Sequence, residues 1–236
     1  MISSAVEQPK GTLVQTATEA VCEHIRSNQL KVGDEIPSEG QFALQLGVSR
    51  PVMREAFHAL AALKMIDVGN GRRARVGAID GSVMAASIGH AVNTAQVSLA
   101  DVWDVRRTLE LRTAELAARN RTEAQAAAIM AAAHTLEVCR DETTRTAADT
   151  AFHQTIALAS GNQLFFQIVR SFEQMMHIAI PQAWAGRTTD QERQESVELH
   201  HEVARAIAER DDELARAAME SHFARSIGDL FHKTTA

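Results

Sequence analysis

The sequence of 236 residues has no tyrosine, only four prolines, two tryptophans and two cysteines. Scarce proline together with abundant alanine, glutamate, glutamine and arginine predicts a mainly α protein. Cys22 and Cys139 form no CxxC pattern, which argues against a disulfide scaffold; we interpret them as thiols, although a bridge between them stays open. No hydrophobic run approaches the roughly 18 residues of a membrane span, and no signal peptide is recognisable. We therefore expect a cytoplasmic protein without a membrane partner.

Negative charge is in excess overall, with a net charge of −6. This value by itself disfavours DNA binding, because a DNA-binding surface neutralises phosphates with lysine and arginine. The charge is unevenly distributed, however. Residues 50–76 carry six basic and two acidic side chains, whereas residues 81–236 carry 15 basic and 21 acidic ones. The sequence therefore predicts a small, locally basic domain joined to a larger acidic one.

The N-terminal part has the pattern of a helix-turn-helix. Apolar spacing predicts a first helix over residues 12–28. A capping box that begins at Ser38 opens a short second helix, which Gly47 ends. Ser49 can cap a third helix, which runs to about Leu63. Two short helices separated by a turn that contains glycine are typical of a helix-turn-helix.

Two short segments that favour β structure follow, Met65–Val68 and Ala74–Val76. Asn70 and Gly71 between them are a hairpin signal, because both central residues of a type I′ turn need positive φ. A helix-turn-helix followed by a basic hairpin predicts a winged helix of three helices and a small β-hairpin over residues 11–77. The alternative is a small helical packing domain with a surface hairpin.

The remaining chain has helical spacing almost throughout. Residues 78–97 are small and weakly polar, and we interpret them as a linker that leads into or includes a helix. Over residues 98–232, capping patterns and turn clusters predict six helices with short connections, which form an all-α antiparallel bundle. Ligand and metal sites in such bundles are built from inward side chains of facing helices.

Four side chains of this bundle could share one cation. Asp149 and His153 are four residues apart and lie on one helical face. His200 lies on the apolar face of a later helix, from which its neighbour His201 is rotated by about 100°, and His222 shares a face with apolar residues. One carboxylate and three imidazoles suit Zn²⁺, Ni²⁺ or Mn²⁺, with positions left for water or a chelating ligand. Ordinary buried histidines are the alternative.

Longer motifs resemble a known family. The N-terminal part is similar to the DNA-binding domain of the GntR superfamily of bacterial transcription regulators in the strings IPSEGQFALQLGVSRPVMREAFHALAALKMI and GNGRRARV. The C-terminal part resembles the all-helical FCD effector domain of the FadR-like branch in the strings DVRRTLELRTAELAARNRT, DTAFHQTIALASGNQLF and ELHHEVARAIAERDDELARAAMESHF. The resemblance implies that the family's metal tetrad, with zinc as the first expectation, falls on Asp149, His153, His200 and His222.

The resemblance also implies which residues contact DNA. They are Ser49, Arg50 and Arg54 at the start of the recognition helix, and Asn70 with Gly71 at the wing tip. Two arginines one turn apart near the N-terminus of a recognition helix suit bidentate reading of guanine in the major groove. Phosphate contacts or surface ion pairs are the alternative for each arginine.

The implied effector pocket contains Arg106, at a position where the family has an arginine that can reach the ligand. Trp184, expected in the loop after a long helix, could cover this pocket or merely fill the core. An anion beside a metal cation and an arginine is electrostatically favourable, so the resemblance predicts a small carboxylate, a sugar acid or other organic acid, as effector. A surface position for Arg106 is the alternative.

Three positions depart from the family's pattern. Gly40 stands where an arginine usually follows the P-S-E element, Lys64 replaces the glycine that usually ends the recognition helix, and Arg73 replaces a glycine common in the wing. These changes affect the expected operator sequence and DNA affinity rather than the identity of the domain.

Together these features predict a metabolite-responsive transcription regulator, most simply a repressor, and not an enzyme. We expect a homodimer that binds double-stranded DNA at an inverted-repeat operator. A metal-dependent hydrolase, in which the four candidate ligands hold a water molecule, is the first alternative, although no general base stands at an obvious spacing. A structural protein that binds DNA without sequence preference is the second.

Overall fold

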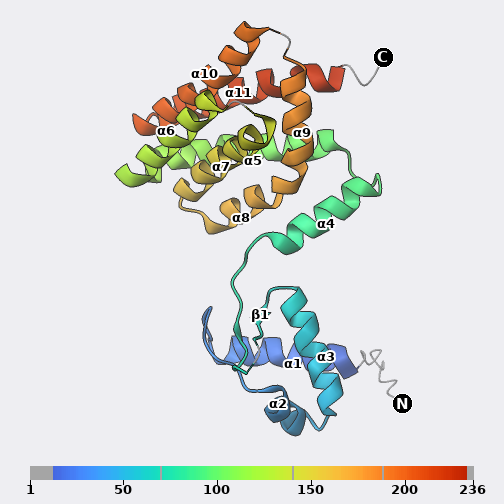
Figure 1. The fold of residues 1–236 in the computed structure, drawn as a ribbon. Helices are drawn as coiled ribbons and strands as arrows, with labels where there is room; N and C mark the ends of the chain where they lie inside the picture. Colours follow the sequence, from blue (N-terminus) through green and yellow to red (C-terminus); the bar gives the residue numbers. More distant parts are fainter. Residues whose placement is uncertain (1–12, 70, 140, 188, 233–236) are drawn as a thin grey trace, which may run out of the picture. The chain divides into compact units, whose positions relative to one another are not determined.

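The computed structural model describes residues 13–232 apart from 70, 140 and 188 (Figure 1). The chain divides into two compact units, residues 1–83 and residues 84–236. The predicted mainly α architecture is confirmed, with a winged helix-turn-helix in the first unit and a helical domain in the second. No helix among the described residues is both long and apolar enough to cross a membrane.

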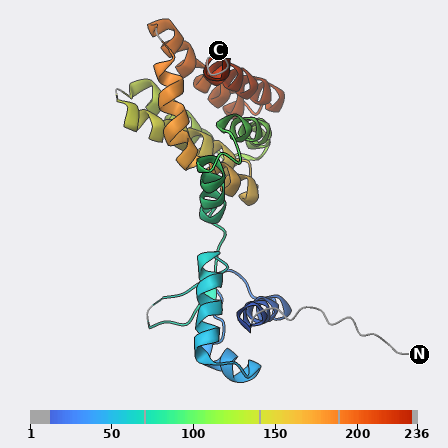
Figure 2. The ribbon, with the colours of Figure 1, turned by 90° about the vertical axis from the view of Figure 1, so that its right-hand side faces the viewer.

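The first unit contains the predicted three helices and two strands. Their bounds are α1 (Leu13–Ser27), α2 (Glu39–Leu46), α3 (Arg50–Ala62), β1 (Ile66–Asp67) and β2 (Arg75–Val76). Helices α1 and α3 pack against each other and cross steeply (Figure 2). Their inward faces form one core with α2 and β1, in which the largest side chains are Phe42, Met53, Phe57, Leu60 and Ile66.

Local hydrogen bonds set the bounds of the helix-turn-helix. The Ser38 hydroxyl accepts from the backbone N–H of Gln41, whose side chain accepts from the backbone of Ser38, so the predicted capping box is present. Gly47 ends α2 in the left-handed conformation with φ of 66°. The Ser49 hydroxyl caps α3 by accepting from the backbone of Val52. The predicted turn between the two helices is therefore confirmed.

The predicted hairpin is present. Ile66 pairs with Val76 and Asp67 with Arg75, so its strands are shorter than the predicted segments, and the loop between them includes Arg72. Arg72 folds back within this loop, and its Nη2 lies 2.8 Å from a carboxylate oxygen of Asp67. Gly71 has φ of 73°, whereas Asn70 lies outside the described residues.

Lys64 occupies a conformation that favours glycine, which explains why glycine is usual at this place. Its φ is 58°, directly after α3. The left-handed region costs a residue with a Cβ atom about 1–2 kcal/mol. Glycine avoids this cost, but its greater conformational freedom in the unfolded chain offsets part of the gain in stability. We expect Lys64→Gly to raise the free energy of unfolding of the first unit by about 0.5–1 kcal/mol. Far-ultraviolet circular dichroism in urea measures this.

Tryptophan fluorescence supplies an internal control for that measurement. Both tryptophans, Trp103 and Trp184, belong to residues 84–236, so their emission reports on the second unit alone. Lys31→Gly is the matched variant, because Lys31 is exposed and has no positive φ. Equal stability of the Lys64→Gly variant and the parent would contradict the cost assigned to this backbone conformation.

Helices alone form the second unit within the described residues, and neighbouring helices pack around one main core (Figure 1). The helix α4 (Ser82–Asn93) crosses the boundary between the units and lies in the predicted linker. The others are α5 (Leu99–Asn120), α6 (Glu123–Val138), α7 (Glu142–Ala159), α8 (Gln163–Ser171), α9 (Glu173–Ala185), α10 (Asp190–Ala208) and α11 (Asp212–His232). Capping boxes at Ser98, Thr122 and Thr189 start α5, α6 and α10, as predicted.

One helix of the expected six is in fact two. The described residues from 98 onwards contain seven helices, because the segment after Asn162 breaks at Phe172 into α8 and α9. No glycine, proline or side-chain cap marks this break. Phe172 is buried instead in a small second core with Val102 and Met175, against which Ile88 of α4 also packs. Packing between helices distant in the sequence therefore decides where this segment bends.

Candidate metal and effector site

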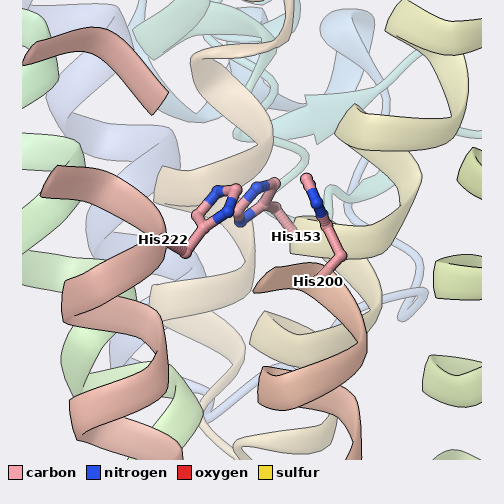
Figure 3. Close-up of side chains that lie close together, drawn as sticks. All are labelled: His153, His200 and His222. Carbon is pink, nitrogen blue, oxygen red and sulfur yellow. The ribbon is translucent and has the colours of Figure 1, made fainter. Parts of the chain in front are cut away.

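Three helices bring the candidate histidines together. His153 comes from α7, His200 from α10 and His222 from α11, and Figure 3 shows their imidazole rings gathered between these helices. All three are buried, with exposed fractions of 2–4%. One nitrogen of each ring lies within 4.8 Å of a nitrogen of each other ring. A cation at the centre of this group could therefore contact three imidazoles.

Asp149 reaches the same place from the preceding turn of α7. One of its carboxylate oxygens lies 3.2 Å from Nε2 of His200, and the other lies 3.8 Å from Nε2 of His153. Burial by itself would raise the pKa of Asp149, but the hydrogen bond with His200 and the nearby imidazoles hold this pKa far below its ordinary value. Asp149 is therefore a carboxylate at any ordinary pH.

Neighbouring groups fix which nitrogen of two histidines faces the centre. The backbone carbonyl of Ser196 accepts a hydrogen bond from Nδ1 of His200 at 2.7 Å, and Nδ1 of His153 contacts the carboxylate of Glu110. The Nε2 atoms of both rings consequently point towards Asp149. Carbonyl and carboxylate partners of this kind orient metal-binding histidines and make them more basic.

The donor set fits a divalent metal ion. A carboxylate oxygen and an imidazole lone pair face each other in the Asp149–His200 pair, so a proton or a metal cation must lie between them. His222 is held neutral, because burial, followed by the charges of His200 and His153, moves its pKa well below its ordinary value. Neutral imidazoles with one carboxylate are suitable ligands for Zn²⁺, Ni²⁺ or Mn²⁺.

Glu110 is a candidate residue of the site that the sequence reasoning missed. It is completely buried on α5, where its two carboxylate oxygens contact Arg106 and His153. Burial would raise the pKa of Glu110, but the charges of Arg106 and His153 outweigh this and lower it. The spacing of Arg106 and Glu110, four residues apart on one helix, is the feature of the sequence that could have indicated this pair.

A cavity adjoins the histidines and contains the candidate effector residues. The cavity has a volume of about 40 Å³, and Arg106, Trp184, Asp149 and the three histidines line it. Arg106 is 2% exposed, which contradicts a surface position. Trp184 lies in the last turn of α9 rather than in the loop expected from the sequence, because this helix continues to Ala185 despite an internal proline.

Two further arginines, Arg145 and Arg187, line the same cavity. The sequence reasoning did not select either of them. Arg145 stands four residues before Asp149 and therefore on the same face of α7, a spacing that could have been noticed. Arg187 comes from the segment after α9 and becomes part of the site only through the fold.

The candidate DNA-binding residues lie in the first unit. Arg50 and Arg54 are exposed in the first turns of α3, and Arg54 lies 3.6 Å from Glu39. Ser49 is the N-cap of this helix, so its hydroxyl already accepts a backbone hydrogen bond. A Cβ atom at Gly40 would lie 3.8 Å from the guanidinium group of Arg50. Glycine at position 40, where the family usually has arginine, therefore leaves the space beside the Arg50 guanidinium group unfilled by a side chain from this position.

The arginines of the wing have acidic partners within the same unit. Arg72 pairs with Asp67 at 2.8 Å, while Arg73 and Arg75 lie 3.7 Å and 2.7 Å from Glu35. These pairs are solvent-exposed and therefore weak, so their arginines can exchange them for phosphates at little cost. Gly71, which directly precedes Arg72, is exposed, and the prediction for Asn70 falls outside the described residues.

A winged helix joined to a helical domain with a polar cavity is an arrangement typical of DNA-binding transcription regulators. Residues 13–76 match the bacterial regulatory proteins of the gntR family, and residues 101–225 match the FCD domain. The chain belongs to the GntR family and carries an FCD domain. It is therefore a DNA-binding transcription regulator and not an enzyme, which leaves the hydrolase alternative without support.

Proteins that are similar to this chain along most of its length are transcription regulators as well. The Glc operon transcriptional activator of Escherichia coli is 26% identical over 89% of this chain and 85% of its own length. The transcriptional regulator LutR of Bacillus subtilis is 27% identical over 84% and 92%, and the repressor NanR of Salmonella newport is 25% identical over 93% and 85%. A GntR structure from Streptococcus agalactiae shares the fold, with a TM-score of 0.66 and 23% identity over 90% of this chain and 97% of its own.

Proposed function

We propose that this protein is a metabolite-responsive repressor whose binding to an inverted-repeat operator is weakened by a small carboxylate. The observation that carries the proposal is the group formed by the partly buried Asp149 and the buried His153, His200 and His222 beside a cavity that Arg106 also lines. Burying so many polar and charged side chains together is costly unless they are paired, hydrogen-bonded or coordinated to a metal ion. Action on DNA places the protein in the cytoplasm.

The four side chains would hold one divalent metal ion, most suitably zinc. The ion would supply positive charge and open coordination positions for the carboxylate. Arg106 would donate to the same anion, while Glu110 keeps Arg106 and His153 in place through its two oxygens. Trp184 would cover the bound molecule from the last turn of α9.

Effector and operator would oppose each other through linkage. A homodimer presents two recognition helices, and a twofold-symmetric operator requires one arrangement of them. If the carboxylate favours another arrangement, each ligand weakens binding of the other by the same factor. This coupling distinguishes a regulator from a structural protein that binds DNA without sequence preference.

A paired measurement tests the proposal. The melting temperature of chelator-treated protein and of zinc-reloaded protein is measured with each of a panel of small carboxylates. The affinity of the same protein samples for a selected DNA duplex is then measured at fixed salt. We expect a rise in melting temperature that requires both zinc and carboxylate, and a fall in duplex affinity with the same compounds. An unchanged duplex affinity with zinc and every carboxylate would contradict the effector role.

Arg50 is expected to carry sequence-specific recognition. A bidentate contact with guanine contributes about 1–3 kcal/mol of discrimination, so Arg50→Ala should weaken binding to a duplex selected by the parent by about 10–100-fold. Fluorescence anisotropy with the selected and a scrambled duplex measures this. Arg26→Ala is the control, because Arg26 is exposed on α1 and paired with Glu23. Equal losses in the two variants would contradict the assignment.

A further inference from the structure

The effector cavity has a second cationic part that the proposed function leaves unused. Arg145 and Arg187 line it together with Trp184. The guanidinium carbon of Arg145 lies 4.1 Å from the centre of the Trp184 ring, and that of Arg187 lies 5.3 Å from it. One indole therefore contacts both guanidinium groups by cation–π interaction.

Arg145 lacks a partner for part of its charge. Its Nε is buried without a hydrogen-bond partner, and its Nη2 donates to the backbone carbonyl of Cys139 at 3.3 Å. Its contacts among the described residues are thus a carbonyl and an aromatic ring, both neutral. A buried donor left unsatisfied costs about 1–3 kcal/mol, more when it is charged. An anion in the cavity would remove this cost.

The two cationic parts lie at different depths along α7. Arg145, Asp149 and His153 follow one another at intervals of four residues, so each step along this helix face is about 6 Å. Arg106 is linked through Glu110 to His153, at the inner end of the row. Arg145 stands at the outer end, one turn beyond Asp149. Arg106 and Arg145 therefore border the cavity on either side of the candidate metal ligands.

The charges differ between the two ends as well. Glu110 already compensates Arg106, and Asp149 faces the histidines. A single carboxylate at the metal and Arg106 would leave Arg145 without an anionic partner. A second carboxylate on the same molecule, about one helical turn away, would reach it.

We propose that the effector is a short dianion, such as a small hydroxy-dicarboxylate. One carboxylate binds at the histidines and Arg106, and the other binds Arg145 and Arg187 against the face of Trp184. This inference rests on the proposed function and adds the chemical class of its ligand. Arg145 and Arg187 become the residues that select a dianion over a monoanion of the same length.

A neighbouring cavity provides a control variant that tests whether positive charge near the site, without direct contact, attracts the anion. Arg145 and Trp184 also border a second cavity of about 450 Å³, where acidic side chains accompany Arg193. Arg193 is paired with Asp190 at 3.4 Å on α10. Because Arg193 lies outside the inner cavity, its removal changes the local charge by the same amount without removing the proposed contact.

The test compares acids that differ by one carboxylate. Isothermal titration of zinc-loaded protein is carried out with three pairs: tartronate and glycolate, malate and lactate, and tartrate and glycerate. We expect at least one dianion to bind at least 10-fold more tightly than its monoanionic partner. Arg145→Gln and Arg187→Gln should each remove most of this preference, while affinity for the monoanion and for zinc stays unchanged. Arg145→Lys should restore part of it, and Arg193→Gln should have no effect.

The outcomes separate this inference from the proposed function. If monoanions bind to zinc-loaded protein at least as tightly as every dianion, the dianion inference is wrong while the carboxylate-binding role stands. Equal weakening of both members of a pair by Arg145→Gln would also overturn it. If no carboxylate of either kind binds to zinc-loaded protein, the proposed effector class itself fails. Circular dichroism of each variant at 222 nm establishes that a loss of binding does not come from unfolding.

Discussion

Replacing His200 with alanine is expected to weaken zinc binding by more than about 100-fold, since changes to groups that only support a metal ligand already cost about 10–100-fold. His200 is 4% exposed and its Nε2 faces Asp149 at 3.2 Å. Its loss removes one of three convergent imidazoles and leaves the negative charge of Asp149 less compensated. Competition with a chromophoric zinc chelator measures the affinity directly.

The neighbouring histidine supplies a matched control. His201 lies on the same helix but is directed towards Glu137 at 3.4 Å, away from the buried group. We expect His201→Ala to retain the zinc affinity of the parent and its carboxylate-dependent rise in melting temperature. His200→Ala should lose both. If the two variants bind zinc equally well, the assignment of the metal site is wrong.

Acidification should have the same effect on metal binding as removal of a ligand. Imidazoles bind metal ions only when neutral, so zinc binding releases any protons that the histidines hold. The affinity for zinc should therefore fall as the pH decreases, because protons compete with the metal ion for the same nitrogen atoms. His222, whose pKa burial lowers, contributes least to this proton release.

Replacing Glu110 with glutamine is expected to destabilise the second unit strongly. Glu110 is completely buried between Arg106 and His153, and the substitution leaves the buried Arg106 charge without its partner. Breaking a buried pair in this way costs about 3–5 kcal/mol. At about 2–4 °C per kcal/mol for a unit of this size, the melting temperature followed by tryptophan fluorescence should fall by about 10 °C.

The pH dependence of this effect follows from the lowered pKa of Glu110. A carboxylate whose pKa is lower in the folded than in the unfolded protein stabilises the fold above its ordinary pKa of 4.5. That stabilisation is lost as the pH falls through the lowered value. The difference in unfolding free energy between the parent and Glu110→Gln should therefore be constant near neutral pH and shrink in acid below about pH 4.5.

A surface pair provides the control for Glu110. Glu198 and Arg205 form an ion pair on α10 in which both side chains are about half exposed. Glu198→Gln should change the free energy of unfolding by less than about 1 kcal/mol, because exposed pairs contribute little. If Glu110→Gln is equally mild, Glu110 does not hold the buried charges of Arg106 and His153 in place.

Helical spacing and the resemblance to the family predicted many of the residues of the candidate site. Asp149 and His153 were predicted on one face of a helix, and they lie on one face of α7. Spacing alone gave no reason to prefer metal ligands over buried core histidines at His200 and His222. The resemblance selected them, and the structure places their rings 4.4 Å apart between centres.

Local sequence patterns specify the starts of the capped helices and the uneven distribution of charge along the chain. Hydrogen bonds within four residues specify a cap, so Ser38, Ser98 and Thr189 marked their helices without knowledge of the fold. Clustered basic residues likewise set residues 50–76 apart from the acidic remainder. Both features depend only on neighbouring residues.

The tertiary structure alone decided the bend at Phe172, the contact of Glu110 with His153, and the meeting of Arg145 with Trp184. In each case the partners come from different helices. Local spacing constrains which face of a helix a side chain occupies, but burial of apolar surface between helices fixes which faces meet. Helical spacing could thus indicate which side chains share a face, such as Asp149 with His153 and Arg106 with Glu110, whereas the contacts between different helices could not be derived from it.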